Sequence, residues 1–272
     1  MPTTESTTTS STTTLPPGPT DATVTLVVGG GEGGWLPLGS WDGSGWAEAP
    51  PDGGLPIAAG TAMQVTNLDG ERAATAGDEV EACFDERTGP TLDVSVGAPD
   101  PPGFGYGAIA STGHGRPLHP RPVAVTATGP DAYRALGEAA FAGVPVDAIL
   151  GQVVQVVVGD LDGDDDDEAV VVFEYVQPSG IVGTRGDLSA VLIVDATSRT
   201  GEAVLTSHVP TDLPDQFMPI SNRFRVIDVS DHNGDGTMEV AVHAWYYEGA
   251  AVALFEYDGT TLEQVLVAGC GA

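Results

Sequence analysis

The sequence predicts a mainly β fold with one short helix. Short apolar segments rich in Val, Ile, Leu and Ala alternate along the chain with Gly, Pro and Asp-Gly turns. Only one stretch shows a clear helical periodicity. A pattern of strand, nine-residue acidic loop and strand occurs twice. The spacing of the short strands is typical of a sandwich, a barrel or a propeller.

Residues 1–21 predict a disordered linker, because nearly every position is Thr, Ser or Pro and no periodic apolar position is available for burial. Tethers of this composition commonly hold a domain away from a cell envelope. We therefore expect an extracellular or cell-envelope-associated protein, with a disordered cytosolic tail as the alternative. No signal peptide is visible in the sequence, since no charged region followed by an apolar region precedes the tract.

The charge of the chain excludes several classes of partner and chemistry. Asp and Glu number 39 against nine basic residues, which gives a formal net charge of −30. Such a charge repels nucleic-acid phosphates and anionic membranes, so we expect no nucleic-acid partner and expect divalent cations instead. All nine basic residues are Arg, which excludes lysine Schiff-base chemistry. No apolar run approaches the roughly 20 residues of a transmembrane segment.

Residues 22–147 predict a β-rich N-terminal region. The glycine run GGGEGGW at 29–35 lacks the following helix of a dinucleotide-binding fingerprint and therefore predicts a loop. Trp35, Trp41 and Trp46 are expected to pack in hairpins, and a carbohydrate-stacking or partner-recognition face is the alternative. The short strands expected in this region are 23–27, 62–66, 79–84, 91–96, 104–110 and 122–127.

One helix is predicted near 130–142, after Thr128 and Gly129. Pro130 suits the first turn of a helix, and Gly143 ends it. The apolar residues of this segment repeat on one face, so we expect the helix to pack on the sheet between the two halves of the chain. The residues on that face are Tyr133, Leu136, Ala140 and Phe141.

Residues 148–272 carry the internal repeat. QVVQVVV (152–158) leads into an acidic loop and EAVVVFEY follows it, while FRVIDV (224–229) and EVAVHAWYY flank a second acidic loop. Asp160 and Asp231, which begin the two loops, are 71 positions apart. SAVLIVDA and GEAVLTSHV supply strands between the copies, and a hairpin that turns at Asp258-Gly259 is expected after them.

Both acidic loops place oxygen-bearing residues at positions one, three, five, seven and nine. Alternate side chains on a tight loop converge on one point, and hard oxygen ligands in this number suit Ca²⁺ better than a transition metal. Gly163 and Gly234 allow the sharp bend, and Gly236 allows a left-handed residue at position six, where the first loop carries Asp165. The candidate metal ligands are Asp160, Asp162, Asp164, Asp166 and Glu168 in the first loop, and Asp231, Asn233, Asp235, Thr237 and Glu239 in the second.

The sequences GDLDGDDDDEAVVV and SDHNGDGTMEVAV resemble the FG-GAP/VCBS calcium-binding repeats of integrin-type β-propellers. The resemblance covers roughly residues 150–272 and implies two Ca²⁺ sites, in which Asp166 and Thr237 contribute carbonyl oxygens and the other candidate ligands contribute side chains. Neither copy carries the Phe-Gly and Gly-Ala-Pro signatures of that family. The chain is also short for a closed ring, so a divergent or partial β-propeller is expected, with a two-layer β sandwich as the alternative. Residues 67–71, followed by Thr75, could form a degenerate third copy, but an ordinary hairpin turn is favoured.

The remaining candidate residues predict no catalytic site. Cys83 and Cys270 either form a disulfide or remain buried thiols, and their spacing is not that of a zinc or redox motif. His114 and His119 lie in a Pro/Gly-rich segment and are expected to be turn residues, while His243 is expected to pack in a strand. No Ser occupies a G-x-S-x-G nucleophile elbow.

The expected function is that of a secreted or envelope-tethered calcium-binding β protein with a structural or binding role. A protein or glycan ligand remains open as a further partner. The alternative is a secreted hydrolase whose active site cannot be identified from the sequence.

Overall fold

A computed structural model describes residues 23–29, 34–50, 57–83, 87–94, 107–113, 116–127, 129–178, 183–214 and 219–271. The predicted linker at 1–21 lies outside the described residues, as does His114. The described chain forms sixteen strands in three sheets, one α-helix and one short 3₁₀-helix, so the mainly β prediction is confirmed. All paired strands are antiparallel.

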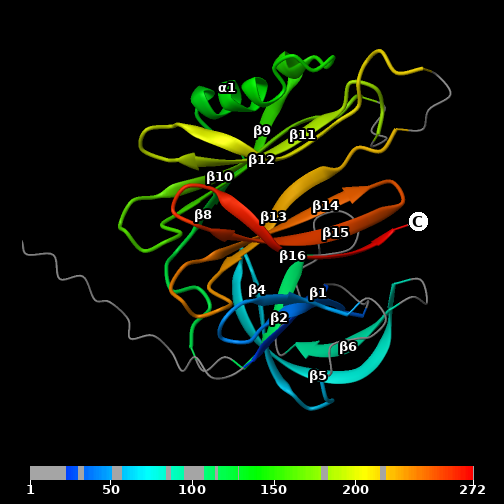
Figure 1. Ribbon diagram of the computed structural model, residues 1–272, viewed down its shortest axis with the longest axis vertical. Coiled ribbons are helices and arrows are strands. Elements are labelled where there is room, and N and C mark those ends of the chain that lie inside the picture. The colour runs from blue at the N-terminus through cyan, green and yellow to red at the C-terminus, as the bar shows by residue number, and fades with distance from the viewer. Residues whose placement is uncertain are drawn as a thin grey trace, which may run out of the picture.

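The first sheet has the order β3-β2-β1-β7-β4-β5-β6 and curls on itself (Figure 1). The last strand of the sheet, β6, returns to the start of β2, where the amide of Trp35 donates to the carbonyl of Pro90 at 3.1 Å. Trp35 fills the inside of the curl and is only 2% exposed. The strands are β1 (Val24–Gly29), β2 (Leu36–Trp41), β3 (Trp46–Glu48), β4 (Ala62–Asn67), β5 (Gly70–Cys83), β6 (Arg87–Val94) and β7 (Ala108–Thr112).

The second and third sheets are built alike. The second sheet has the order β12-β11-β10-β9-β8, and the third has the order β13-β14-β15-β16. In both sheets four consecutive strands form an antiparallel meander, and an acidic loop joins the first two strands of that meander. The strands are β8 (Ala124–Thr126), β9 (Gln152–Gly159), β10 (Glu168–Tyr175), β11 (Leu188–Asp195), β12 (Gly201–His208), β13 (Arg223–Ser230), β14 (Glu239–Tyr246), β15 (Gly249–Tyr257) and β16 (Leu262–Gly271).

The third sheet lies between the other two (Figure 1) and is buried on both faces. Successive side chains of a strand point to opposite faces of the sheet. Because both faces are buried here, β14 is apolar at consecutive positions. Val240 and Val242 lie in one hydrophobic cluster with Val170 of the second sheet. Ala241 packs in the cluster that contains Leu26 of the first sheet. This arrangement places the two acidic loops on neighbouring sheets.

The helix α1 (Asp131–Ala140) forms where the sequence predicts it, but it does not lie between the two halves of the chain. Tyr133 and Phe141 pack against Phe173 on the outer face of the second sheet, at one end of the stack (Figure 1). The inner face of that sheet is already covered by the third sheet, so only the outer face is open to the helix. The 3₁₀-helix η1 (Ala148–Leu150) follows and leads into β9.

Cys83 at the end of β5 and Cys270 in β16 form a disulfide, with their Cα atoms 5.6 Å apart. Of the two alternatives left open by the sequence, pairing is therefore the one observed. The bond joins the first sheet to the third across 187 positions of the chain. It closes a long loop of the unfolded chain, which is the situation in which a disulfide stabilises most in the chain-entropy model.

Candidate metal centre

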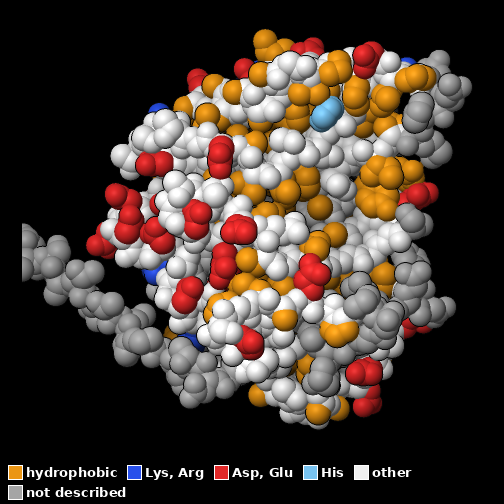
Figure 2. All heavy atoms as spheres, viewed as in Figure 1, with side chains coloured by type: hydrophobic (Ala, Val, Ile, Leu, Met, Phe, Trp, Pro, Cys, Tyr) orange, Lys and Arg blue, Asp and Glu red, His pale blue; other side chains and the backbone are white. Residues whose placement is uncertain are grey.

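Each acidic loop begins directly after one strand and ends at the first residue of the next. Asp160 follows β9 and Glu168 begins β10, while Asp231 follows β13 and Glu239 begins β14. Both glutamates are anchored in the interior, with 7% of Glu168 and 1% of Glu239 exposed. Figure 2 shows that Asp and Glu side chains gather at the left of the view, where strands of the second and third sheets turn in Figure 1.

The backbones of the two loops have matching conformations. Gly163 and Gly234 occupy position four with φ of 84° and 87°. At position six, Gly236 has φ of 98° and Asp165 has φ of 74°, so Asp165 adopts the left-handed conformation expected of it. The two copies of the repeat therefore share a main-chain geometry as well as a sequence spacing.

The hydrogen bonds inside the loops also repeat. The first aspartate of each loop accepts the amide of the glycine at position four, with 2.6 Å for Gly163 to Asp160 Oδ1 and 2.6 Å for Gly234 to Asp231 Oδ1. The closing glutamate accepts the amide of position two, at 2.9 Å for Glu168 and 2.6 Å for Glu239. These bonds turn the carboxylates at positions one and nine into the concave side of the loop.

In the first loop, Asp160, Asp162 and Glu168 each offer a carboxylate oxygen, and these three oxygens lie within 4.8 Å of one another. Two oxygens bound to one Ca²⁺ at about 2.3–2.6 Å are at most about 5 Å apart, so this separation fits a shared calcium ion. Asp164 lies outside this group of three, and its Oδ1 accepts the amide of Asp166 at 2.8 Å. Three of the four predicted side-chain ligands of the first loop are thus brought together.

Two carboxyl groups of the first loop have raised pKa values. Burial, together with the charges of Asp162 and Asp164, raises the pKa of Glu168 to about 7. Burial and the charge of Asp164 also raise the pKa of Asp162. Both shifts mean that negative charge at this loop is energetically unfavourable in the protein without a bound ion. A bound divalent cation would offset this cost.

The second loop differs from the first in its charges. Asn233 replaces an aspartate at position three, and Arg116 Nη1 lies 2.9 Å from Asp231 Oδ2. Asn233 Nδ2 donates to Asp235 at 3.2 Å and to Glu256 at 2.9 Å, while the amide of Thr237 donates to Asp235 Oδ1 at 2.7 Å. Asp231 is thus paired with a cationic side chain, while Asn233 and Asp235 belong to a separate set of contacts. Among the described residues, only the first loop brings three carboxylate oxygens within 4.8 Å of one another.

One carboxylate oxygen of Glu239, in the second loop, is buried without a hydrogen-bond partner among the described residues. This oxygen is Oε1, whereas Oε2 of the same carboxylate accepts the amide of His232. Burial, with the charges of Asp231 and Asp235, raises the pKa of Glu239 well above its ordinary value. A buried carboxylate oxygen without a donor is rare, and a cation at the centre of the loop would satisfy it.

Two arginines at the loops could not be assigned from the sequence. Arg116 contacts the second loop, and Arg121 donates to carbonyl oxygens in both loops. The one available signal is their charge, because a chain with a net charge of −30 has only nine basic residues. Their position in a Pro/Gly-rich segment gave no indication of contacts 39 to 115 positions away.

Residues 67–71 form the hairpin turn between β4 and β5, as the sequence favoured, and not a third calcium loop. The carboxylate of Glu71 is used elsewhere, since its Oε1 accepts the amides of Leu118 and His119 at 2.7 Å each. This turn therefore holds the segment that carries Arg116 and Arg121.

His119 is part of a buried polar network and is more than a turn residue. Its Nε2 lies 3.0 Å from Ser230 Oγ, and its Nδ1 lies 3.4 Å from Glu71 Oε1. This order resembles a Ser-His-Glu triad, but Ser230 is fully buried and its hydroxyl donates to Asp228 at 2.8 Å. A substrate has no access to that hydroxyl, so the network joins the first and third sheets instead of forming a reactive centre.

The tryptophans are built into the fold, as the hairpin interpretation predicts. Trp35 is buried, and Trp41 of β2 lies opposite Trp46 of β3 with ring centroids 5.2 Å apart. Both rings pack against the core cluster between the first and third sheets. Trp46 Nε1 also donates to Glu256 at 3.0 Å.

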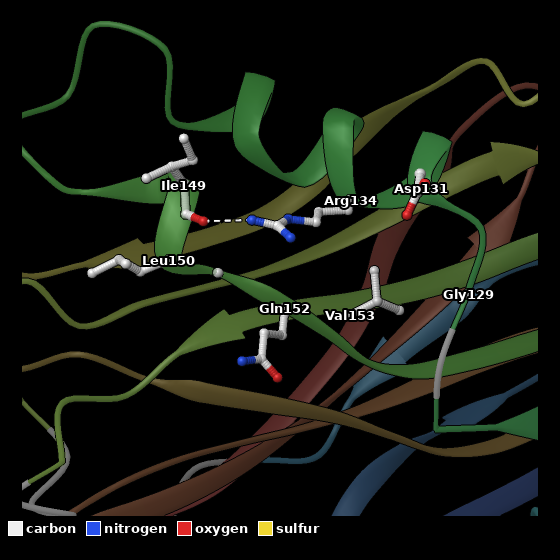
Figure 3. A pocket seen from close by; sticks show the side chains of 8 residues that line it. Gly129, Asp131, Arg134, Ile149, Leu150, Gln152 and Val153 are labelled. Carbon is white, nitrogen blue, oxygen red and sulfur yellow. Dashed lines mark hydrogen bonds between the residues drawn. The ribbon is translucent and has the colours of Figure 1, made fainter.

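Three hollows are lined by residues outside the two acidic loops. The one beside α1 has a volume of about 450 Å³ and includes Asp131, Arg134, Ile149 and Leu150 (Figure 3). In it, Arg134 Nη2 donates to the carbonyl of Ile149 at 2.6 Å. Two others adjoin β4 and β16. None of these three hollows contains a histidine or a pair of carboxylates among its described lining residues.

Comparison of the chain with protein-family models, with curated proteins and with solved structures found no match. The resemblance of the two loops to FG-GAP/VCBS repeats therefore stays a prediction. Of the helices in the described residues, none is both long and apolar enough to cross a lipid bilayer.

Proposed function

We propose that this is a calcium-binding β protein, in which two Ca²⁺ ions stabilise strand connections in the second and third sheets. The observation that carries the proposal is the group of oxygens from Asp160, Asp162 and Glu168, which lie within 4.8 Å of one another. The repetition of the same backbone geometry around Asp231 and Glu239 supports a second site of the same kind.

The proposed ligands are the predicted ones. The first ion would be held by the side chains of Asp160, Asp162, Asp164 and Glu168 and the carbonyl of Asp166. The second would be held by the side chains of Asp231, Asn233, Asp235 and Glu239 and the carbonyl of Thr237. All of these are hard oxygen donors on a short loop, and in this number they suit the large, variable coordination shell of Ca²⁺ better than the strict octahedron of Mg²⁺.

The role of the ions would be structural. Each loop ends in a buried glutamate that begins a central strand, so a cation would fix the place where two strands of a meander enter the core. At millimolar external Ca²⁺ and with Kd values of about 10⁻⁴–10⁻³ M, each site would add about 0.4–1.5 kcal/mol of stability. This is enough to order a loop, and it fits an exported or envelope-tethered protein that meets calcium outside the cell.

The hydrolase alternative has less support. It requires a histidine or a carboxylate pair in an accessible cleft, and the described constellation closest to that requirement uses the buried hydroxyl of Ser230. A protein or glycan ligand remains compatible with the calcium-binding proposal and would be a second property of the same protein.

Thermal unfolding with 5 mM CaCl₂ and with a chelator tests the proposal. For a domain of this size, about 1 kcal/mol corresponds to roughly 2–4 °C in Tm, so two sites should raise Tm by several degrees. Glu168→Gln combined with Glu239→Gln should remove this rise. Glu263→Gln, an exposed position on β16, is the matched control and should keep it. An equal Tm with calcium and with chelator would contradict the proposal.

A further inference from the structure

One short segment, residues 116–121, contacts both acidic loops. At its start, Arg116 donates to the carboxylate of Asp231 at 2.9 Å and to the carbonyl of Asp231 at 3.2 Å. In its middle, the carbonyl of Leu118 accepts the amide of Asp231 at 2.7 Å. At its end, Arg121 reaches the first loop as well as the second. The same six residues therefore connect the two loops.

Arg121 holds three carbonyl oxygens with one guanidinium group. Its Nε donates to the carbonyl of Asp160 at 2.6 Å, and its Nη2 donates to the carbonyls of Leu161 at 2.8 Å and of Gly236 at 2.7 Å. The guanidinium is planar and its donors point in fixed directions. A movement of the main chain at positions one and two of the first loop is therefore transmitted to position six of the second.

A direct main-chain bond joins the loops as well. The amide of Met238, at position eight of the second loop, donates to the carbonyl of Leu161 at 2.8 Å. Leu161 and Met238 are both buried in the hydrophobic cluster between the second and third sheets. The carbonyl of Leu161 thus serves two donors, one from Arg121 and one from the second loop itself.

We propose that Arg121 couples the two loops, so that a divalent cation bound in one loop raises the affinity of the other. This inference rests on the calcium-binding function proposed above. The unpartnered Glu239 Oε1 independently supports a cation in the second loop, because it is a buried acceptor that no described donor satisfies.

Whether the coupling is positive or negative follows from how much conformational freedom each loop still has when its own cation binds. A cation in the first loop fixes Asp160 and the adjoining peptide, and with them the carbonyls that Arg121 and Met238 contact. The position of Gly236 is then already fixed when the second cation binds. The amide of Gly236 donates to Asp231 Oδ2 at 3.2 Å, so this proposed ligand is held as well. The second binding event then orders less of the chain, which gives positive cooperativity.

Repulsion between the two cations acts against this sign, because a Ca²⁺ bound in the first loop adds two positive charges whatever carboxylates surround it. At 0.15 M salt the part of this repulsion that passes through solvent is screened. Positive cooperativity therefore requires that the ordering of the shared backbone outweighs the screened repulsion, and the titration below measures the sum of the two effects.

Calorimetric titration with Ca²⁺ alone, in 0.15 M KCl, tests the coupling in variants with one loop disabled. Asp162→Asn with Asp164→Asn disables the first loop, and Asp235→Asn with Glu239→Gln disables the second. We expect that disabling either loop lowers the Ca²⁺ affinity of the other loop by the same factor, about 5- to 10-fold, because coupling is reciprocal. In an Arg121→Lys background, which keeps the charge but loses the planar fork, disabling one loop should weaken the Ca²⁺ affinity of the other by a clearly smaller factor, because only the bond from Met238 to Leu161 still joins the loops. Arg134→Gln on α1 is the control and should keep the coupling.

The outcomes separate this inference from the function on which it rests. If neither loop of the wild-type protein binds Ca²⁺, the proposed function itself is wrong. If both loops bind and disabling one leaves the other unaffected, the coupling is wrong while the function stands. Should the Arg121 variant fail to fold, the comparison of the two loop-disabled proteins still decides whether coupling exists. Full coupling in Arg121→Lys would contradict the assignment to Arg121.

Discussion

Arg116 Nη1 lies 2.9 Å from Asp231 Oδ2, so the second loop has a cationic side chain on the residue that should be its first calcium ligand. Only 4% of the Asp231 side chain is exposed, which makes the pair a partly buried one. The first loop has a looser equivalent, with Arg121 Nε 3.7 Å from Asp160 Oδ2. The two loops therefore share a backbone geometry but differ in how their first aspartate is neutralised.

This difference predicts that Arg116 weakens calcium binding at the second loop. Arg116→Gln removes a positive charge beside the site and should raise the affinity of that loop about 3- to 10-fold, since charges at this range interact by about 1 kcal/mol in water. Without calcium, the same change should lower the free energy of unfolding by about 1–3 kcal/mol, because Asp231 loses a charged hydrogen bond. Calcium titration and denaturant unfolding measure the two effects, and a weakened second site would contradict the argument.

The positive φ of Asp165 predicts that a β-branched residue lowers stability at this position but not at its neighbour. Its φ of 74° is tolerated by Asp but is poor for a β-branched residue, so Asp165→Val should cost about 1–2 kcal/mol. Asp167→Val removes the same charge from an exposed neighbour without a positive φ and is the matched control. Thermal unfolding in the presence of chelator compares them. Equal losses of stability in the two variants would show that the left-handed conformation of Asp165 is not the cause of the destabilisation.

The strands of the C-terminal half could be predicted because they are continuous apolar runs between clear turns, as in Glu168–Tyr175. In the N-terminal half, LPLGSW predicts no strand because it contains Pro and Gly, yet it forms β2. The structure places Pro37 at a register shift of the β1–β2 pair, where a residue without an amide is tolerated. The first part of β5 also predicts no strand, because its small and polar residues resemble a loop.

The conformation of the loops could be predicted from spacing alone, since the bend at Gly163 and the left-handed residue at Asp165 are local properties. The arginines could not be predicted in the same way. Arg121 reaches Gly236 across 115 positions, and such a contact depends on how the sheets stack. The outer position of α1 depends on the same stacking.

The disulfide predicts a large loss of stability on reduction. It closes a loop of 187 positions, and the chain-entropy model gives about 5 kcal/mol as an upper estimate for such a loop. Cys83→Ser with Cys270→Ser should lower the free energy of unfolding by several kcal/mol in denaturant titrations. A reducing agent should lower the stability of the wild-type protein and leave the double variant unaffected. Equal stability of the two proteins would refute this prediction.

The network around His119 predicts a pH dependence of stability. Burial alone would lower the pKa of His119, but Asp228 and Glu71 outweigh it and raise the pKa above its ordinary value of 6.5. The stabilising effect of His119 is therefore complete below about pH 6.5 and is lost as the pH rises through the higher pKa of the folded protein.

Unfolding free energies at pH 6 and pH 8.5 test this dependence in the wild type and in His119→Gln. The stability difference between the two proteins should be larger at pH 6 and should shrink at pH 8.5. Charges elsewhere affect both proteins alike, so the comparison isolates His119. A difference that grows with pH would contradict the assignment of the raised pKa to this network.

Equilibrium dialysis at millimolar Ca²⁺ in 0.15 M KCl, with the bound metal counted per chain, tests the calcium-binding claim most directly. The control is a protein in which exposed acids away from the loops are neutralised, Asp131→Asn with Glu263→Gln, because a net charge of −30 also gathers loosely held cations. At the affinities expected above, we predict that the wild type and this control bind about one to two ions more per chain than the protein with Asp162→Asn, Asp164→Asn, Asp235→Asn and Glu239→Gln. Equal amounts of bound calcium in all three proteins would contradict the account.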